Sequence, residues 1–152
     1  MYSINWFDVV GLFLFIAGFV IGLGAVTVID IHGFLGRKSP YWTEATTRTH
    51  KVTKPMIWAG MVLAVCGGFV LYRNEAFVGI PLVHAVAAIV LVANGLFLSF
   101  RVSPFLLERE RTGHSRELLP ASWQTKIAVS LIVSDIVWWG SLGALVVYVL
   151  GR

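Results

Sequence analysis

Six polar side chains interrupt long apolar stretches of this sequence, and their types are suited to binding an ion or moving a proton. They are Asp135, His84, Asn94, Ser134, Thr27 and Asp30. An ionised side chain at the centre of a bilayer costs at least about 2.5–3.5 kcal/mol, so such residues point to a function. Together they predict a polar site that holds an ion, relays a proton or binds a polar group of a ligand.

The expected depths of these residues place several of them near one level. Asp135 and His84 each lie eight residues into an apolar stretch, from opposite sides, which puts each about 12 Å deep. In a hydrocarbon core about 30 Å thick their heights differ by only about 6 Å, which allows a contact between them. Asn94 is about 9–10 Å deep, on the same side as Asp135. The alternative for Asn94 and Asp135 is a structural role, as hydrogen-bond partners of serines or of the backbone. The alternative for Asp30 is a side chain that reaches the water of the headgroup region.

Four apolar segments must position these residues. Of the 152 residues, 57% are hydrophobic and 13% are charged, and the mean hydropathy is +0.80. Soluble domains carry about 25% charged residues. A helix needs about 20 apolar residues to cross a bilayer, and the segments that qualify are residues 6–30, 55–72, 76–100 and 127–150. We therefore predict one all-α domain over residues 1–152, an integral membrane antiparallel bundle of four transmembrane helices.

Basic residues are distributed unequally between the predicted loops. Ten of the twelve lie in the first and third loops, namely Arg37, Lys38, Arg48, Lys51, Lys54, Arg101, Arg109, Arg111, Arg116 and Lys126. The positive-inside rule then predicts a multi-pass protein of the bacterial inner membrane, with these loops cytoplasmic and both termini outside. The same charges predict contact with anionic lipid headgroups rather than with nucleic acid.

Local signals predict helical structure in both basic loops. In the first loop, Thr43 is expected to cap a short helix over residues 44–54, and Pro55 then marks the bilayer edge. In the third loop, residues 103–111 are expected to extend the third helix as far as Gly113.

Small and aromatic residues indicate how the helices pack. Gly18 and Gly22 form a GxxxG pattern, which lets two helices approach closely. We expect the partner to be a helix of the same chain. One alternative is a flat face for a planar ligand. The other is contact with a second copy, because a transport path through four helices calls for a homo-oligomer, and this face is then its candidate interface. Trp138 and Trp139 point about 100° apart on a helix, so only one of them is expected to face the core.

No pattern in the sequence defines a catalytic centre or a metal site. His32, His50 and His114 lie in or near the basic loops, where we expect solvated side chains, and their spacing does not predict a metal site. The single cysteine, Cys66, excludes an intrachain disulfide. Walker, GxSxG, HExxH and dinucleotide-binding motifs are absent from the sequence, so we name no catalytic residue and favour a protein that is not an enzyme.

Longer stretches of the sequence resemble a known group. They read FIAGFVIGLGAVTVIDIHGFLG, TKPMIWAGMVL, and VHAVAAIVLVANGLFLSF followed by RVSPFLLERER. This pattern, over roughly residues 10–148, resembles the four-helix membrane superfamily of haem-type protoporphyrinogen oxidase and CopD-like proteins. It resembles the small uncharacterised bacterial members more closely. The resemblance implies haem b as a cofactor with His84 as an axial ligand. Leu12, Phe13 and Leu14 stand where the oxidase carries its haem-ligating histidine.

Three functions therefore stay open. The first is an oligomeric membrane protein that binds or moves a small ion, a proton or a metabolite through its polar site. The second is a haem-binding membrane redox protein, on the strength of the resemblance. The third is an assembly subunit of a membrane complex that binds no ligand.

Overall fold

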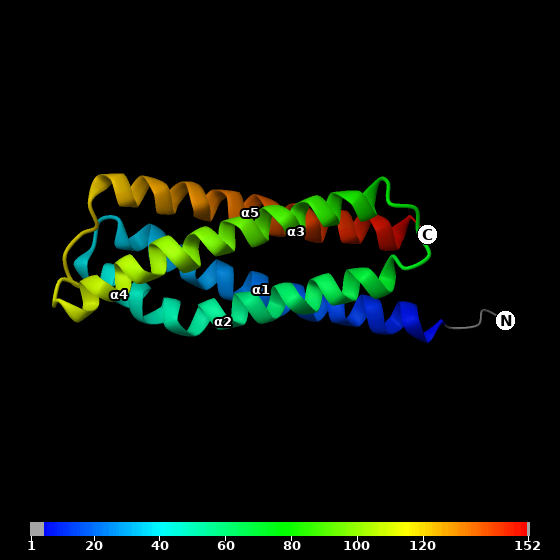
Figure 1. Cartoon of the computed structure of the whole chain (residues 1–152), viewed down its shortest axis with the longest axis horizontal. Helices are drawn as coiled ribbons and strands as arrows, with labels where there is room; N and C mark the ends of the chain where they lie inside the picture. The colour runs from blue at the N-terminus through cyan, green and yellow to red at the C-terminus, as the bar shows by residue number, and fades with distance from the viewer. Residues whose placement is uncertain (1–4, 152) are drawn as a thin grey trace.

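The computed structural model describes residues 5–151 and consists of four long helices joined by short connections (Figure 1). The elements are α1 (Trp6–Gly36), α2 (Pro40–Leu71), α3 (Ile80–Phe97), the π-helical turn η1 (Leu98–Val102), α4 (Ser103–Arg111) and α5 (Ala121–Leu150). Elements α3, η1 and α4 follow one another without a break, so they form the third long helix. The described part of the chain contains no strand.

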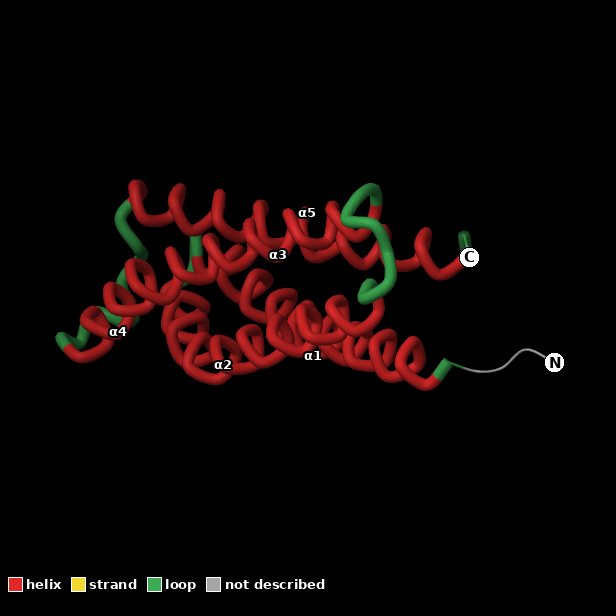
Figure 2. Tube along the Cα trace, turned by 45° about the vertical axis from the view of Figure 1, so that its right-hand side comes forward, coloured by secondary structure: helices red, strands yellow, loops and turns green. Residues whose placement is uncertain are grey.

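All four helices are long and apolar enough to cross a membrane, which is the architecture of a multi-pass membrane protein. The prediction of an all-α bundle with four such helices is confirmed. The 31 residues of α1 extend about 46 Å at 1.5 Å per residue, which exceeds a hydrocarbon core of about 30 Å. The loops lie only at the two ends of the molecule (Figure 2). Both ends of the chain lie at the end opposite to the α1–α2 and α4–α5 connections (Figure 1).

Glycines bring α1 and α2 into backbone contact. A Cβ atom on Gly18 would lie 2.5 Å from the backbone nitrogen of Ala64, and one on Gly11 would lie 2.8 Å from that of Leu71. Gly60 of α2 packs in turn on the backbone of Gly22. The GxxxG face therefore binds a helix of the same chain. The alternative, in which this face joins two copies, is wrong for this fold because α2 already covers it.

The structure corrects two of the predicted helix boundaries. Instead of a short helix over residues 44–54, α2 is one helix that begins after Ser39 and continues through Pro55. Thr43 lies inside α2, where its hydroxyl donates to the Gly36 carbonyl at 2.8 Å, rather than capping a helix. Contact with α1 along its length holds α2 helical even where Pro55 removes a backbone hydrogen bond.

The second correction concerns the start of the third long helix. It begins at Ile80 rather than at residue 76, because Gly79 has a φ of 59°, which does not fit a right-handed helix. At the other end, α4 covers residues 103–111 and Gly113 follows with a φ of 81°. The predicted extension of this helix is therefore confirmed.

The tightest part of the core is aromatic. Phe15 stacks on Phe19 at 5.3 Å between ring centroids, and Phe19 contacts the edge of Trp138 at 5.6 Å. Trp138 is 1% exposed and Trp139 is 56% exposed, so the prediction that only one of the two faces the core is confirmed. Aromatic packing thus fixes α5 against α1.

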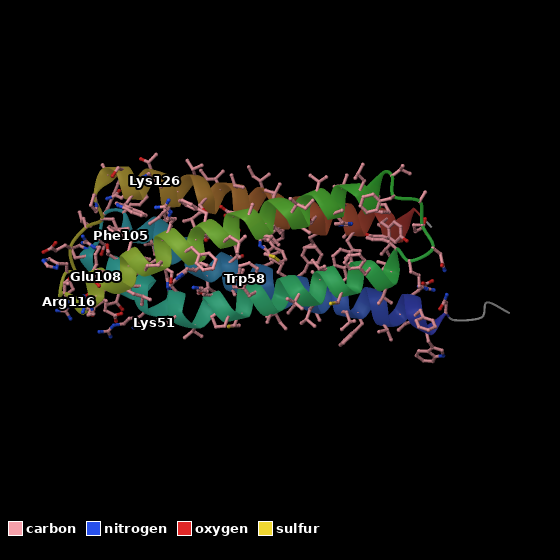
Figure 3. The ribbon with its side chains drawn as sticks, viewed as in Figure 1. Lys51, Trp58, Phe105, Glu108, Arg116 and Lys126 are labelled. Carbon is pink, nitrogen blue, oxygen red and sulfur yellow. The ribbon has the colours of Figure 1, made fainter. Side chains whose placement is uncertain are left out.

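Charged side chains cluster at the end of the bundle opposite to the termini (Figure 3). Lys51 of α2 pairs with Glu110 of α4 at 2.6 Å, and Arg116 pairs with Glu44 of α2 at 2.7 Å. We call this end, which carries α4 and the α1–α2 and α4–α5 connections, the basic end. Its ion pairs join α2 to the segment that precedes α5.

Candidate functional site

A cavity of about 550 Å³ lies between the long helices in the half of the bundle nearest the basic end. Residues of all six elements line it, and its walls are largely apolar. Ligand pockets in proteins commonly measure about 300–1,000 Å³ and combine apolar walls with a few polar groups. The cavity is therefore large enough for a small organic molecule and far larger than a single ion needs.

Asp30 of α1 and Asp135 of α5 meet at one wall of the cavity. Their carboxyl groups lie within hydrogen-bonding range of each other. Asp30 is only 9% exposed, and its Oδ2 is buried without a hydrogen-bond partner among the described residues. Two adjacent carboxylates that are shielded from water do not both stay charged unless a cation lies beside them; otherwise they share a proton. We call Asp30 and Asp135 the carboxyl pair.

Two basic side chains of α2, which the sequence did not indicate as site residues, also line the cavity. His50 and Lys54 line it from successive turns of α2, and the Nε2 of His50 is buried with no hydrogen-bond partner in residues 5–151. Lys54 forms no ion pair with any described residue, unlike its neighbour Lys51. We call His50 and Lys54 the basic wall. The expectation that His50 is solvated is wrong, because α2 carries it into the bundle.

The sequence does contain a spacing that indicates the basic wall, but the predicted helix boundaries placed its residues in different elements. His50, Lys54 and Trp58 are spaced four residues apart, which places them on one face of a helix. The spacing has this meaning only if one helix continues through Pro55, as α2 does. Trp58 also lines the cavity, and its indole nitrogen donates to Ser99 of η1 at 3.2 Å.

Two of the other polar residues of the predicted site, Asn94 and Thr27, are hydrogen-bonded within the bundle. Asn94 donates to the Ser130 carbonyl at 3.1 Å and accepts from the Ser130 hydroxyl at 2.6 Å, which ties α3 to α5. Thr27 donates to the Leu23 carbonyl of its own helix at 2.8 Å. Asn94, Thr27 and the buried Ser134 all line the cavity. They shape its walls, whereas the carboxyl pair and the basic wall keep unused hydrogen-bonding capacity.

His84 lies outside this cavity, and the contact with Asp135 that their depths allow does not form. Its Nε2 donates to the Ser141 carbonyl at 2.8 Å, which leaves Nδ1 to accept from the Tyr72 hydroxyl at 2.8 Å. The ring is 8% exposed and also touches the ring of Phe15, with 4.9 Å between centroids. Because both nitrogens are engaged and the ring is enclosed, His84 does not fit the role of an axial haem ligand.

Among residues 5–151, no group of three or more His, Cys, Asp or Glu side chains converges as a metal site would require. No family model, curated protein or solved structure matches this chain. The resemblance to the haem-type oxidase superfamily therefore stays a hypothesis.

Proposed function

We propose that this protein binds a small cation, or the cationic group of a metabolite, inside the membrane, in exchange for the proton that the carboxyl pair shares. The observation that carries the proposal is the buried Asp30 Oδ2, which has no partner among the described residues and belongs to a carboxyl pair at the wall of a 550 Å³ cavity. A buried acceptor left unpaired costs about 1–3 kcal/mol, and a bound cation removes that cost.

The charged groups around the cavity support an exchange rather than permanent charge on the pair. Asp30 faces the cavity from α1, Arg37 from the residue that follows α1, His50 and Lys54 from α2, and Asp135 from α5. None of these three basic residues forms an ion pair with the carboxyl pair within residues 5–151. A proton or an external cation is therefore the available counter-charge.

The proposed orientation follows from the distribution of basic residues. We infer that the basic end faces the cytoplasm of a bacterial cell, against anionic headgroups, and that both termini lie outside. The cavity then lies in the cytoplasmic half of the membrane. All of its walls come from one chain, so binding needs no second copy, and an oligomer that moves the solute would use a surface other than the GxxxG face.

The test measures proton release when cations bind to the purified protein in phosphatidylglycerol nanodiscs. Sodium, potassium and methylammonium chlorides are added in weak buffer near neutral pH, and a pH indicator reports the protons. We expect saturable release of up to about one proton per chain for at least one of these cations. Asp135→Asn and Asp30→Asn should each abolish it.

Asp8→Asn is the matched control, because Asp8 lies at the opposite end of α1 and pairs with Arg73 at 2.7 Å. This variant should release protons as the native protein does. Release that persists in both cavity variants, or no release with any of the three cations, would contradict the proposal. Unfolding temperatures of all variants confirm that each is folded.

A further inference from the structure

The cavity is lined by acidic and basic groups from different helices, and this arrangement constrains the ligand beyond a simple cation. The carboxyl pair belongs to α1 and α5 and the basic wall belongs to α2, while Arg37 also lines the cavity just after the end of α1. No ion pair joins the two walls within the described residues. The charges of the cavity therefore do not neutralise each other by direct contact.

The basic wall has the same unused capacity as the carboxyl pair. Its buried His50 Nε2 has no hydrogen-bond partner within residues 5–151. Half-buried Lys54 lines the cavity beside His50 and forms no ion pair there, whereas its neighbour Lys51 pairs with Glu110. Buried polar groups are nearly always paired, so the unpartnered Asp30 Oδ2 and His50 Nε2 around one cavity point to a ligand that pairs with both.

We infer that the ligand is amphoteric: it carries an ammonium group for the carboxyl pair, an oxyanion for the basic wall, and an apolar part attached to these charged groups. The inference rests on the proposed function and names its substrate class. The apolar part would lie against Trp58 and Trp138, which line the cavity together with aliphatic side chains. Both a free amino acid and the headgroup of phosphatidylethanolamine have this chemistry.

Three matched probes separate the two charges. Phenylalanine carries both, phenylethylamine lacks the carboxylate, and 3-phenylpropionate lacks the ammonium group. Equilibrium dialysis against the protein in phosphatidylglycerol nanodiscs should show that phenylalanine binds at least about tenfold more tightly than either analogue, because each charge-assisted hydrogen bond contributes about that factor.

Lys54→Gln tests the basic wall. This variant should lose the preference for phenylalanine over phenylethylamine, while phenylethylamine binds as it does to the native protein. Lys51→Gln is the matched control, since Lys51 is one turn away but pairs with Glu110 and does not line the cavity. It should keep the full preference. His50→Gln provides a second variant of the wall should Lys54→Gln not fold.

A second set of nanodiscs that also contain phosphatidylethanolamine distinguishes the two sources of the ligand. If this lipid weakens phenylalanine binding to the native protein but not to Lys54→Gln, the natural ligand is the lipid headgroup; if it has no effect, the ligand is a free metabolite.

An unchanged preference in Lys54→Gln overturns the inference, and so does equal binding of phenylalanine and phenylethylamine to the native protein. Absence of binding by all three probes also overturns it. In each of these cases, cation-dependent proton release that requires Asp135 would leave the proposed function standing.

Discussion

The polar side chains inside the bundle fall into two classes that differ in how fully they are hydrogen-bonded. Asn94 and His84 form hydrogen bonds with residues of neighbouring helices, as residues that stabilise a fold do. Asp30 and His50 each keep a buried atom without a partner among the described residues, and both line the cavity. The second class costs stability, which is common where a protein binds a ligand.

Asp135→Asn separates these two roles. If Asp135 serves binding, the amide should remove the conflict between two carboxyl groups and donate a hydrogen bond to Asp30. We then expect the ligand-free protein to gain about 1 kcal/mol of unfolding free energy. Chemical unfolding in mild detergent, followed by circular dichroism, measures this. A clear loss of stability would instead assign Asp135 to helix packing. Asn94→Ala provides the comparison and should lose stability, because it leaves Ser130 unpaired.

Tyr72→Phe tests whether His84 stabilises the fold through its hydrogen bonds rather than taking part in binding. The change removes only the hydroxyl that donates to Nδ1, so we expect a loss of about 1 kcal/mol of unfolding free energy. Binding in the cavity should be unaffected, because neither residue lines it. The same unfolding and proton-release measurements check both statements. A loss of proton release without a loss of stability would mean that the His84 cluster takes part in binding.

From the sequence we could predict which polar residues lie within apolar segments, but not which of them contact one another. Asp30, Asp135, Asn94, Ser134 and Thr27 were all predicted, because polar groups in apolar segments are costly and conspicuous. Depth along a helix places a residue at a height, yet it leaves the rotation of the helix undetermined. The pairing of Asp135 with Asp30 depends on that rotation, which only packing sets.

Helix pairing in this protein depends on glycine more than on hydrogen bonds. Gly11 and Gly18 of α1 lie against α2, and Gly60 and Gly67 of α2 lie against α1, so a Cβ atom at any of these four would clash with the backbone of the partner helix. A Cβ atom on Gly22 would instead meet the Trp138 ring of α5 at 2.6 Å. The sequence identified Gly18 and Gly22 as a packing face but did not identify α2 as the partner. Because the second span was predicted to start at residue 55, His50 and Lys54 were not expected to lie on the same helix face as Trp58.

Gly18→Ala should disrupt this pairing. The added methyl would lie 2.5 Å from the Ala64 nitrogen, and backbone atoms move only if the two helices separate. We expect a loss of about 1–3 kcal/mol of unfolding free energy, as overpacked cores show. Gly143→Ala in α5 is the control. No atom lies within 4 Å of its Cβ position, so it should be neutral or gain up to about 1 kcal/mol from higher helix propensity. Equal effects of the two substitutions would contradict the proposed α1–α2 packing.

The molecule as a whole divides into a closed half and an open half. In the half nearer the termini, the rings of Phe15, Tyr72, His84 and Tyr148 pack against one another. The cavity occupies the half nearer the basic end. Composition and charge were enough to predict four spans with the basic loops on one side. They could not predict a cavity, because its volume depends on how the α1–α2 pair and the α3–α5 pair lie against each other.

The side of the membrane that the open half faces decides where the solute enters, and labelling of single cysteines can establish it. In a Cys66→Ala background, Lys38→Cys marks the basic end and Asn74→Cys marks the opposite end; both positions are exposed. If the positive-inside rule holds, a membrane-impermeant maleimide should label only the Asn74→Cys variant in intact cells, and both variants after the cells are opened. The cavity then takes up its ligand from the cytoplasm. Labelling of Lys38→Cys in intact cells would show the opposite orientation, in which the cavity takes up solutes from outside the cell. The reversal would leave the binding chemistry of the cavity unchanged, because the carboxyl pair and the basic wall both lie within one chain.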